Sequence, residues 1–134
     1  MCIRDSGLAT PDDYRRDAPN THAGGAAALA QLMELPEPPT AIVAPTDVLA
    51  MGMLHEAHQR GSRVPDDISI TGFDDIPVAA YAVPALTTVR MPTEAMVLAA
   101  VDLAIGRDEV LGDFHPLLEP ELVIRESTGP APTH

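Results

Sequence analysis

Two short apolar runs, TAIVA (residues 40–44) and ISITGF (residues 68–73), constrain the fold of this chain most strongly. Each run has the length and apolar content of a strand, and the first, which is bounded by prolines, is typical of a strand buried on both faces. The segment between them is long enough for a helix that ends at Gly61. Because such a helix carries the chain back to the same edge of a sheet, we expect the two strands to lie parallel.

Further helix and strand patterns continue this alternation along the chain. The run AGGAAALAQLMEL (residues 23–35) carries alanine and leucine at helical spacing, and prolines follow it. We also expect a helix that runs through Arg60 with Thr46 or Asp47 as its N-cap, a helical turn over 78–81, a strand over 86–90, a helix over 93–105 and a strand over 121–126. This order predicts an α/β fold, a mostly parallel sheet with helices on both faces.

The first 22 residues do not follow this pattern. The opening MCIRDS (residues 1–6) resembles the translation of a sequencing adapter, so we interpret it as an assembly scar and expect the native chain to begin further upstream. Residues 7–22 are polar and rich in Pro, Asp and Arg, which indicates an irregular segment. The folded domain is therefore expected to span residues 23–134.

Charge and composition exclude several classes of function. The formal net charge is −12, all 8 basic residues are arginine, and lysine is absent. A phosphate-binding P-loop and a Schiff-base enzyme each need a lysine. Binding of DNA needs clustered positive charge. No segment approaches the roughly 20 apolar residues of a membrane span, and the single Cys2 cannot form an internal disulfide. We therefore expect a soluble domain with no membrane contact and no DNA-binding surface of its own.

Polar side chains follow the first two strands at the point where each one ends. Thr46 and Asp47 come after the first strand, and Asp74 and Asp75 come after the second. Ligands of open parallel sheets bind beyond the carboxyl ends of the strands, so we expect the two turns to be neighbours. Their oxygens would form an acceptor-rich rim that suits a sugar or another polyol. Asp47 could instead act only as a helix cap, and the Asp74-Asp75 pair only as part of a turn.

The same residues lie within a longer series of motifs. The stretches VPDDISITGFDD (residues 64–75), PALTTVR (84–90) and PELVIREST (120–128) occur in the order and at the spacing of the lactose/galactose-repressor (LacI) family of bacterial transcription regulators. The chain resembles that family from about Gly24 to Gly129. The resemblance implies a sensor domain with a periplasmic-binding-protein-like fold, in which two subdomains close on a small-molecule effector. It also implies an upstream helix-turn-helix that binds operator DNA.

The resemblance assigns roles to individual residues. Asp74 matches a residue that contacts the effector, whereas Asp75 matches one that organises the turn. Thr46 stands where the family usually has an effector-binding asparagine, Met91 where many sugar-binding members have a glutamine, and Pro19 at an aromatic stacking position. Threonine keeps an acceptor but lacks the donors of an amide, so the effector is not identified by the sequence. The predicted ligand-binding residues are Thr46, Asp47, Asp74 and Met91.

One face of the expected helix after Thr46 suits association with a second copy of the chain. The predicted contact residues are Met51, Leu54, His55 and His58 on this helix and Tyr81 in the segment after the second strand. The resemblance implies that both elements contribute to a symmetric homodimer contact, and an ordinary amphipathic surface helix is the alternative. The sequence HEAH (residues 55–58) lacks the i, i+4 histidine spacing of the zinc motif, so we expect no metal site.

The expected function is effector sensing by a cytoplasmic, homodimeric transcription regulator, with no cofactor and no chemical reaction. The resemblance places the other half of the cleft in an N-terminal subdomain upstream, which would also cover the helix over 93–105. One alternative is a periplasmic sugar-binding protein of a transport system, which has the same fold. A second alternative is an enzyme that uses Asp74 and Asp75 as an acid/base pair, but the sequence supplies no convincing nucleophile or metal ligand beside them.

Overall fold

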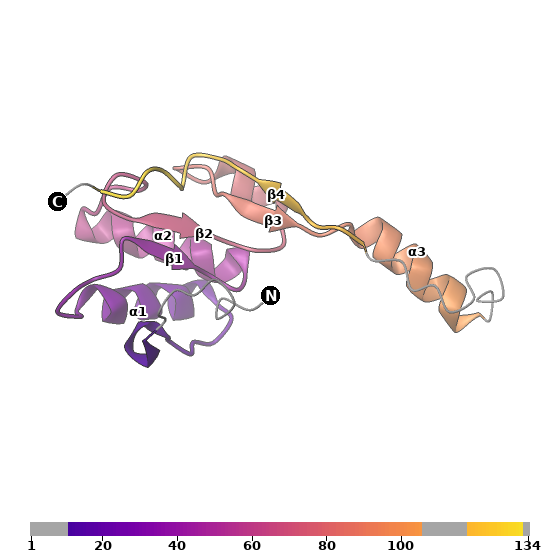
Figure 1. The fold of residues 1–134 in the computed structure, drawn as a ribbon, viewed down its shortest axis with the longest axis horizontal. Helices are drawn as coiled ribbons and strands as arrows, with labels where there is room; N and C mark the ends of the chain where they lie inside the picture. Colours follow the sequence, from indigo (N-terminus) through magenta and orange to yellow (C-terminus); the bar gives the residue numbers. More distant parts are fainter. Residues whose placement is uncertain (1–10, 106–117, 133–134) are drawn as a thin grey trace.

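A parallel pair of strands, β1 and β2, forms the centre of the fold (Figure 1). The computed structural model describes residues 11–105 and 118–132. Its elements, in chain order, are the 3-10 turn η2 (Asp12–Tyr14), helix α1 (His22–Met33), strand β1 (Ala41–Val43), helix α2 (Asp47–Arg60), strand β2 (Ser69–Thr71), the 3-10 helix η3 (Pro77–Tyr81), strand β3 (Thr88–Arg90), helix α3 (Thr93–Ala104) and strand β4 (Glu121–Val123). In the central pair Ile42 lies opposite Ile70, and α2 connects the two strands. The predicted parallel strand-helix-strand unit is therefore confirmed.

Capping residues set the ends of the two central helices. Thr21 and Thr46 are the N-caps of α1 and α2, and their side-chain oxygens accept hydrogen bonds from the backbone N–H groups of Gly24 (3.0 Å) and Leu49 (3.3 Å). Gly61 ends α2 in the left-handed conformation (φ 73°), which glycine adopts without steric cost. The cap at Thr46 and the stop at Gly61 agree with the sequence prediction.

Helices α1 and α2 touch each other through their backbones. A Cβ atom at Gly25 would lie 2.0 Å from the carbonyl oxygen of Leu49, and a Cβ atom at Gly52 would lie 1.9 Å from the carbonyl oxygen of His22. Both distances are far below van der Waals contact, so a side chain of any size would force the helices apart. Glycine is therefore required at both positions for this close approach.

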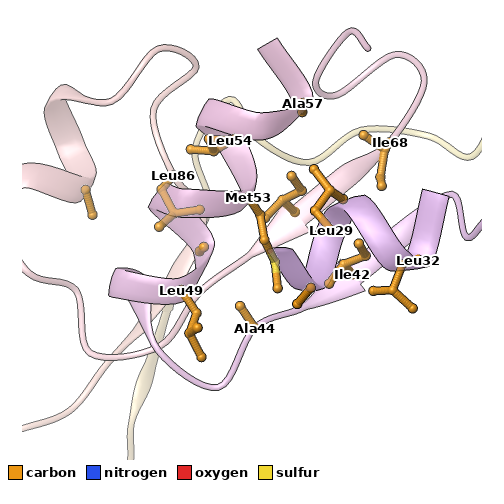
Figure 2. Packing of buried hydrophobic residues seen from close by; sticks show 14 residues of the cluster. Leu29, Leu32, Ile42, Ala44, Leu49, Met53, Leu54, Ala57, Ile68 and Leu86 are labelled. Atoms are coloured by element: carbon orange, nitrogen blue, oxygen red, sulfur yellow. The ribbon is translucent and has the colours of Figure 1, made fainter. Parts of the chain in front are cut away.

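The hydrophobic core lies between these two helices and one face of the β1–β2 pair. Leu29 of α1 and Met53 of α2 belong to the same buried cluster as Ile42 and Ile70 of the strands (Figure 2). The cluster also contains Ala28, Leu32, Ala44, Leu49, Ala50, Leu54, Ala57, Ile68, Ala79 and Leu86. Alternate side chains of a strand point to opposite faces, and Val43 on the other face is 67% exposed. The prediction that β1 is buried on both faces is therefore wrong, because in the described residues α1 and α2 cover the same face.

A second, antiparallel pair of strands leads away from this body. Strands β3 and β4 pair with Thr88 opposite Val123, and a parallel bridge from Thr71 to Thr87 joins β3 to β2. Helix α3 follows β3 and projects beyond the rest of the described structure (Figure 1). None of its residues is buried, and its exposed apolar side chains include Met96, Val97, Leu98, Val101 and Leu103. Covering of α3 by an upstream subdomain remains a prediction. No described helix is both long and apolar enough to cross a membrane.

Candidate functional site

The turn between β1 and α2 and the turn after β2 lie against each other. The backbone N–H of Asp47 donates a hydrogen bond to the carbonyl oxygen of Phe73 (2.8 Å), and the N–H of Ala44 donates one to Thr71 (2.9 Å). These bonds place the two acidic turns side by side beyond the carboxyl ends of the parallel strands. The neighbourhood of the two turns that we predicted from the sequence is confirmed.

Asp47 lies inside the protein rather than on the rim. Its side chain is fully buried, and its two carboxylate oxygens accept hydrogen bonds from the hydroxyl of Thr88 and from the backbone N–H of Ile76 (2.8 Å). Gly72 makes room for this carboxylate, because a Cβ atom there would lie 2.1 Å from Asp47 Oδ1. This burial corrects the prediction that Asp47 contacts a ligand: both of its oxygens hold the α2 start to the neighbouring turn and strand.

Thr46 lies half-buried at the rim, next to a residue that the sequence patterns did not indicate. Besides capping α2, the hydroxyl of Thr46 donates a hydrogen bond to the amide oxygen of Asn20 (2.6 Å). Asn20 is exposed and immediately precedes Thr21, the N-cap of α1. We expected residues 7–22 to be irregular. The one local sequence signal for a role of Asn20 was its position directly before a helix cap. The pairing with Thr46 depends on the close approach of the two helices.

Asp74 and Asp75 occupy consecutive left-handed backbone positions. Their φ angles are 114° and 52°, values that residues other than glycine adopt rarely and mostly as Asn or Asp. Asp74 is exposed, and none of the ion pairs among residues 11–105 and 118–132 involves it. The side chain of Asp75 is only 8% exposed and forms ion pairs with Arg125 (2.6 Å) and Arg90 (2.7 Å). The two neighbouring carboxylates therefore differ in role: Asp74 faces solvent and Asp75 is held by the protein.

The arginines around Asp75 keep its carboxylate ionised. Burial is the largest single influence and favours the neutral acid, but the hydrogen bonds from Arg125 and Arg90 and their charges together outweigh it. The pKa of Asp75 therefore lies below its ordinary value. On the other side of the pair, the hydrogen bond and the charge of Asp75 raise the pKa of Arg90, and Glu121 contributes to the same shift.

Met91 lies just beyond the end of β3. It is half-buried and lines a broadly open, mostly apolar hollow together with Pro92, Thr93, Glu94, Ala95 and Leu98. Two residues earlier, the carbonyl oxygen of Val89 accepts a hydrogen bond from the backbone N–H of Asp74 (3.0 Å). Three of the four predicted ligand-binding residues, Thr46, Asp74 and Met91, therefore follow the ends of β1, β2 and β3.

The predicted dimer surface is exposed or half-buried except at one residue. Tyr81 is 83% exposed, His55 and His58 are exposed, and Met51 is half-buried. Leu54, in contrast, is 6% exposed and belongs to the core cluster. Its prediction as a contact residue is wrong because α2 is buried over a wider arc than one apolar stripe: Leu86 and Ala79 of the η3–β3 region join the same cluster as the residues of α1.

The chemistry available at this rim is hydrogen bonding. The exposed Asp74 and Asn20 and the half-buried Thr46 can accept several hydrogen bonds, and the Asn20 amide can also donate. Within the described residues, no group of three or more His, Cys, Asp or Glu side chains could hold a metal ion.

Comparisons with known proteins agree with this architecture. Residues 1–128 match the family described as periplasmic binding protein-like domain. The chain is 36% identical over 137 residues to the HTH-type transcriptional repressor CytR of Escherichia coli K12, covering 98% of this chain and 39% of CytR. Among solved structures, a LacI family transcriptional regulator from Mycobacterium smegmatis is 34% identical with a TM-score of 0.80, covering 98% of this chain and 50% of that one. The transcriptional regulator CelR, solved as a cellobiose complex, is 29% identical with a TM-score of 0.79, covering 93% of this chain and 39% of CelR.

These similarities include the central βαβ unit, the acidic turns and the β3–β4 pair, because they cover nearly all of the chain. The chain itself spans less than half the length of CytR. The fold and the matched regulators agree with the family that the motifs indicated. The chain belongs to the periplasmic binding protein-like family, and over nearly all of its length it is similar to LacI-type transcription regulators.

Proposed function

We propose that this chain forms part of the effector-binding domain of a LacI-type regulator, and that its effector is a sugar or a related polyol. In this proposal the effector binds at the rim formed by the two acidic turns, and binding changes the affinity of a cytoplasmic homodimer for operator DNA. The DNA contact itself belongs to a helix-turn-helix outside the described residues. Coupling free energies between such sites are typically about 1–3 kcal/mol.

One observation carries this proposal. The turn after β2 presents the carboxylate of Asp74 to solvent, while the adjacent Asp47 and Asp75 are buried in contacts within the protein. The exposed carboxylate of Asp74 stands in the turn that adjoins the one carrying Thr46 and its partner Asn20, and this set of polar groups suits a neutral ligand with several hydroxyl groups. The cellobiose complex of CelR supports a carbohydrate as the ligand class.

The same observation argues against catalysis and the matched relatives argue against transport. Asp75 is engaged by two arginines, so it is not free to share a proton with Asp74 as an acid/base pair would require. The relatives reported above are transcription regulators, which favours a regulator over a periplasmic sugar-binding protein.

Replacing Asp74 with asparagine should weaken effector binding by at least about tenfold, because a hydrogen bond to a charged group contributes about 1.5–3 kcal/mol. Asparagine tolerates the left-handed backbone at this position, so the turn should keep its shape. Calorimetric titration of the full-length protein with a panel of mono- and disaccharides measures the change.

The matched control is Asp66→Asn, which makes the same chemical change at an exposed carboxylate paired with Arg63. It should leave sugar affinity unaltered. Equal affinities of the wild-type protein and Asp74→Asn for the best sugar of the panel would remove Asp74 from the binding site.

We also propose that α2 and η3 contribute to the homodimer. Met51→Glu should shift the protein toward monomer, because it places a charge within the half-buried apolar part of the proposed contact. Tyr81→Ala tests the same surface without touching the core, since Tyr81 is 83% exposed. Sedimentation or light scattering gives the mass, with the exposed Ala27→Glu on α1 as the control. A dimer that survives both Met51→Glu and Tyr81→Ala would exclude this surface.

A further inference from the structure

The ion pairs of Asp75 connect the candidate rim to the two strands that lead to α3. We propose that Asp75, Arg90 and Arg125 form a clamp that holds the turn over residues 73–76 in the conformation that presents Asp74, and that fastens this turn to β3 and β4. Asp75 is then a positioning residue that acts through Asp74. The clamp deepens the proposed function, although only its consequence for ligand binding rests on that function.

The turn needs such a restraint because its backbone is strained. Asp74 (φ 114°) and Asp75 (φ 52°) both lie in the region that favours glycine. Strained non-glycine conformations persist only where the surrounding structure over-determines them, and they concentrate at functional sites. A turn of this kind that carried no outside contacts would relax and move the Asp74 carboxylate.

Three consecutive backbone N–H groups fix one side of the turn. The N–H of Asp74 donates to the carbonyl oxygen of Val89 (3.0 Å), and that of Asp75 donates to the hydroxyl of Thr88 (3.4 Å). The N–H of Ile76 donates to the buried carboxylate of Asp47 (2.8 Å). These acceptors belong to β3 and to the first residue of α2, so the backbone of the turn is attached to two elements.

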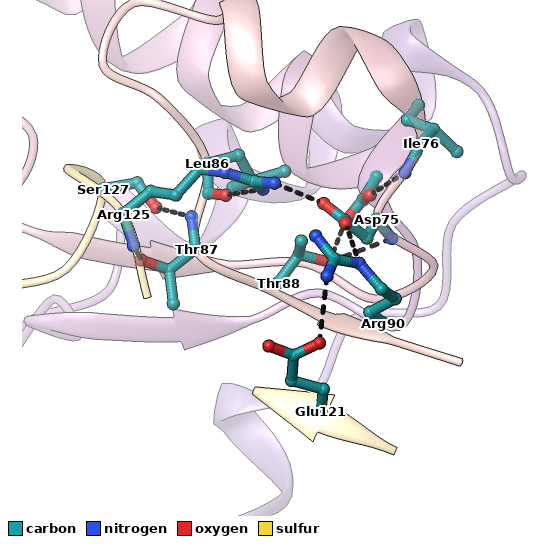
Figure 3. Close-up of polar contacts among 10 residues, drawn as sticks. Asp75, Ile76, Leu86, Thr87, Thr88, Arg90, Glu121, Arg125 and Ser127 are labelled. Atoms are coloured by element: carbon teal, nitrogen blue, oxygen red, sulfur yellow. Dashed lines mark hydrogen bonds and ion pairs between the residues drawn. The ribbon is translucent and has the colours of Figure 1, made fainter. Parts of the chain in front are cut away.

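The carboxylate of Asp75 fixes the other side. Oδ1 accepts a hydrogen bond from Arg125 Nη2 (2.6 Å) and Oδ2 accepts one from Arg90 Nε (2.7 Å), as Figure 3 shows. Arg125 is itself held, because its Nη1 donates to the carbonyl oxygen of Leu86 (2.7 Å) and its backbone N–H donates to the hydroxyl of Thr87 (2.9 Å). A nearly buried carboxylate with two charged donors, of which Arg125 is the less exposed, is a strong anchor.

The clamp also spans the strands that connect the body to α3. Arg90 is the last residue of β3, and its Nη1 donates to Glu121 (2.9 Å), the first residue of β4 (Figure 3). Arg125 lies two residues beyond the other end of β4. A displacement of β3 relative to β4 therefore changes the contacts of Asp75, and a displacement of the turn changes the contacts between the strands.

Amide hydrogen exchange, followed by NMR on the complete chain without any ligand, tests the clamp directly. In Asp75→Asn the amides of Asp74 and Ile76 should exchange at least about tenfold faster, because the turn opens locally without unfolding. The amides of Ile42 and Ile70 in the central strands report global stability and should keep their rates. Unchanged turn amides would overturn the proposal, and so would an equal acceleration at Ile42 and Ile70, which would mean a general loss of stability.

Two further variants separate the clamp from a change of charge. Arg90→Gln should reproduce the effect on the turn, whereas Arg90→Lys, which keeps a charged donor, should recover much of the protection. Asp67→Asn is the matched control, since Asp67 pairs with Arg63 at the same distance (2.6 Å) as Asp75 with Arg125, and the side chain of Asp67 makes no described hydrogen bond to the turn. Equal exchange rates in Arg90→Gln and Arg90→Lys would also overturn the proposal. These measurements use no sugar, so their outcome does not depend on the result of the titrations of Asp74→Asn.

Discussion

Gly52→Ala should lower the free energy of unfolding by about 1–3 kcal/mol, the usual cost of inserting atoms into a well-packed contact. Helix propensity alone predicts the opposite, a gain of about 1 kcal/mol, because alanine favours a helix interior more than glycine does. The added methyl group would lie 1.9 Å from the carbonyl oxygen of His22, a backbone atom that no rotamer change can move away. The clash should therefore outweigh the gain in helix propensity. Urea denaturation followed by circular dichroism shows whether the free energy of unfolding falls or rises.

Gly129→Ala provides the control for this substitution. Its Cβ atom would meet only the ring of Pro65, at 3.2 Å and 3.3 Å, so a shift of a few tenths of an ångström suffices. Stability should change little there. If Gly52→Ala were as stable as the wild-type chain, or more stable, the direct contact between the backbones of α1 and α2 would be refuted.

Asp47→Ala should destabilise the protein by about 3 kcal/mol or more, since it removes two hydrogen bonds to a charged acceptor, each contributing about 1.5–3 kcal/mol. The substitution leaves the buried hydroxyl of Thr88 and the half-buried N–H of Ile76 without their acceptors. Asp47→Asn should cost less, because its amide oxygen can still accept from Ile76 while its NH2 group donates to Thr88.

The order of stabilities, wild type above Asp47→Asn above Asp47→Ala, distinguishes a buried bridge from a simple helix cap. The control is Asp12→Ala at an exposed site, which should change the unfolding midpoint very little. An Asp47→Ala variant as mildly affected as Asp12→Ala would contradict the bridge.

Local patterns in the sequence were sufficient to predict the helices and the central parallel pair, because caps, stops and apolar periodicity act over a few residues. Thr46 and Gly61 are examples: each does what its type and its place relative to α2 predict. The burial of β1 could not be predicted in this way. An apolar run has the same appearance whether one face or two are covered, and the exposure of Val43 depends on where α1 and α2 pack.

The site residues show the same difference between features set by local sequence and features set by distant contacts. The meeting of the two acidic turns follows from the parallel order of the strands, which the sequence predicts. The partners of Asp47 and Asp75 do not, because they are distant in the chain: Thr88 lies 41 residues from Asp47, and Arg125 lies 50 residues from Asp75. Only the family resemblance indicated that Asp75 organises the turn. Leu54 was misassigned for a related reason, since its burial involves the η3–β3 region as well as α1.

The contact between α1 and α2 bears on how a signal could cross this domain. Where glycines bring two helix backbones together, there are no intervening side chains whose rotamers could absorb a small shift. The two helices should therefore move as one rigid body, with Asn20 and Thr46 near their N-terminal ends and the exposed His55 and His58 further along α2. A tilt of the helices at the rim would therefore tilt the outer surface of α2 by the same angle.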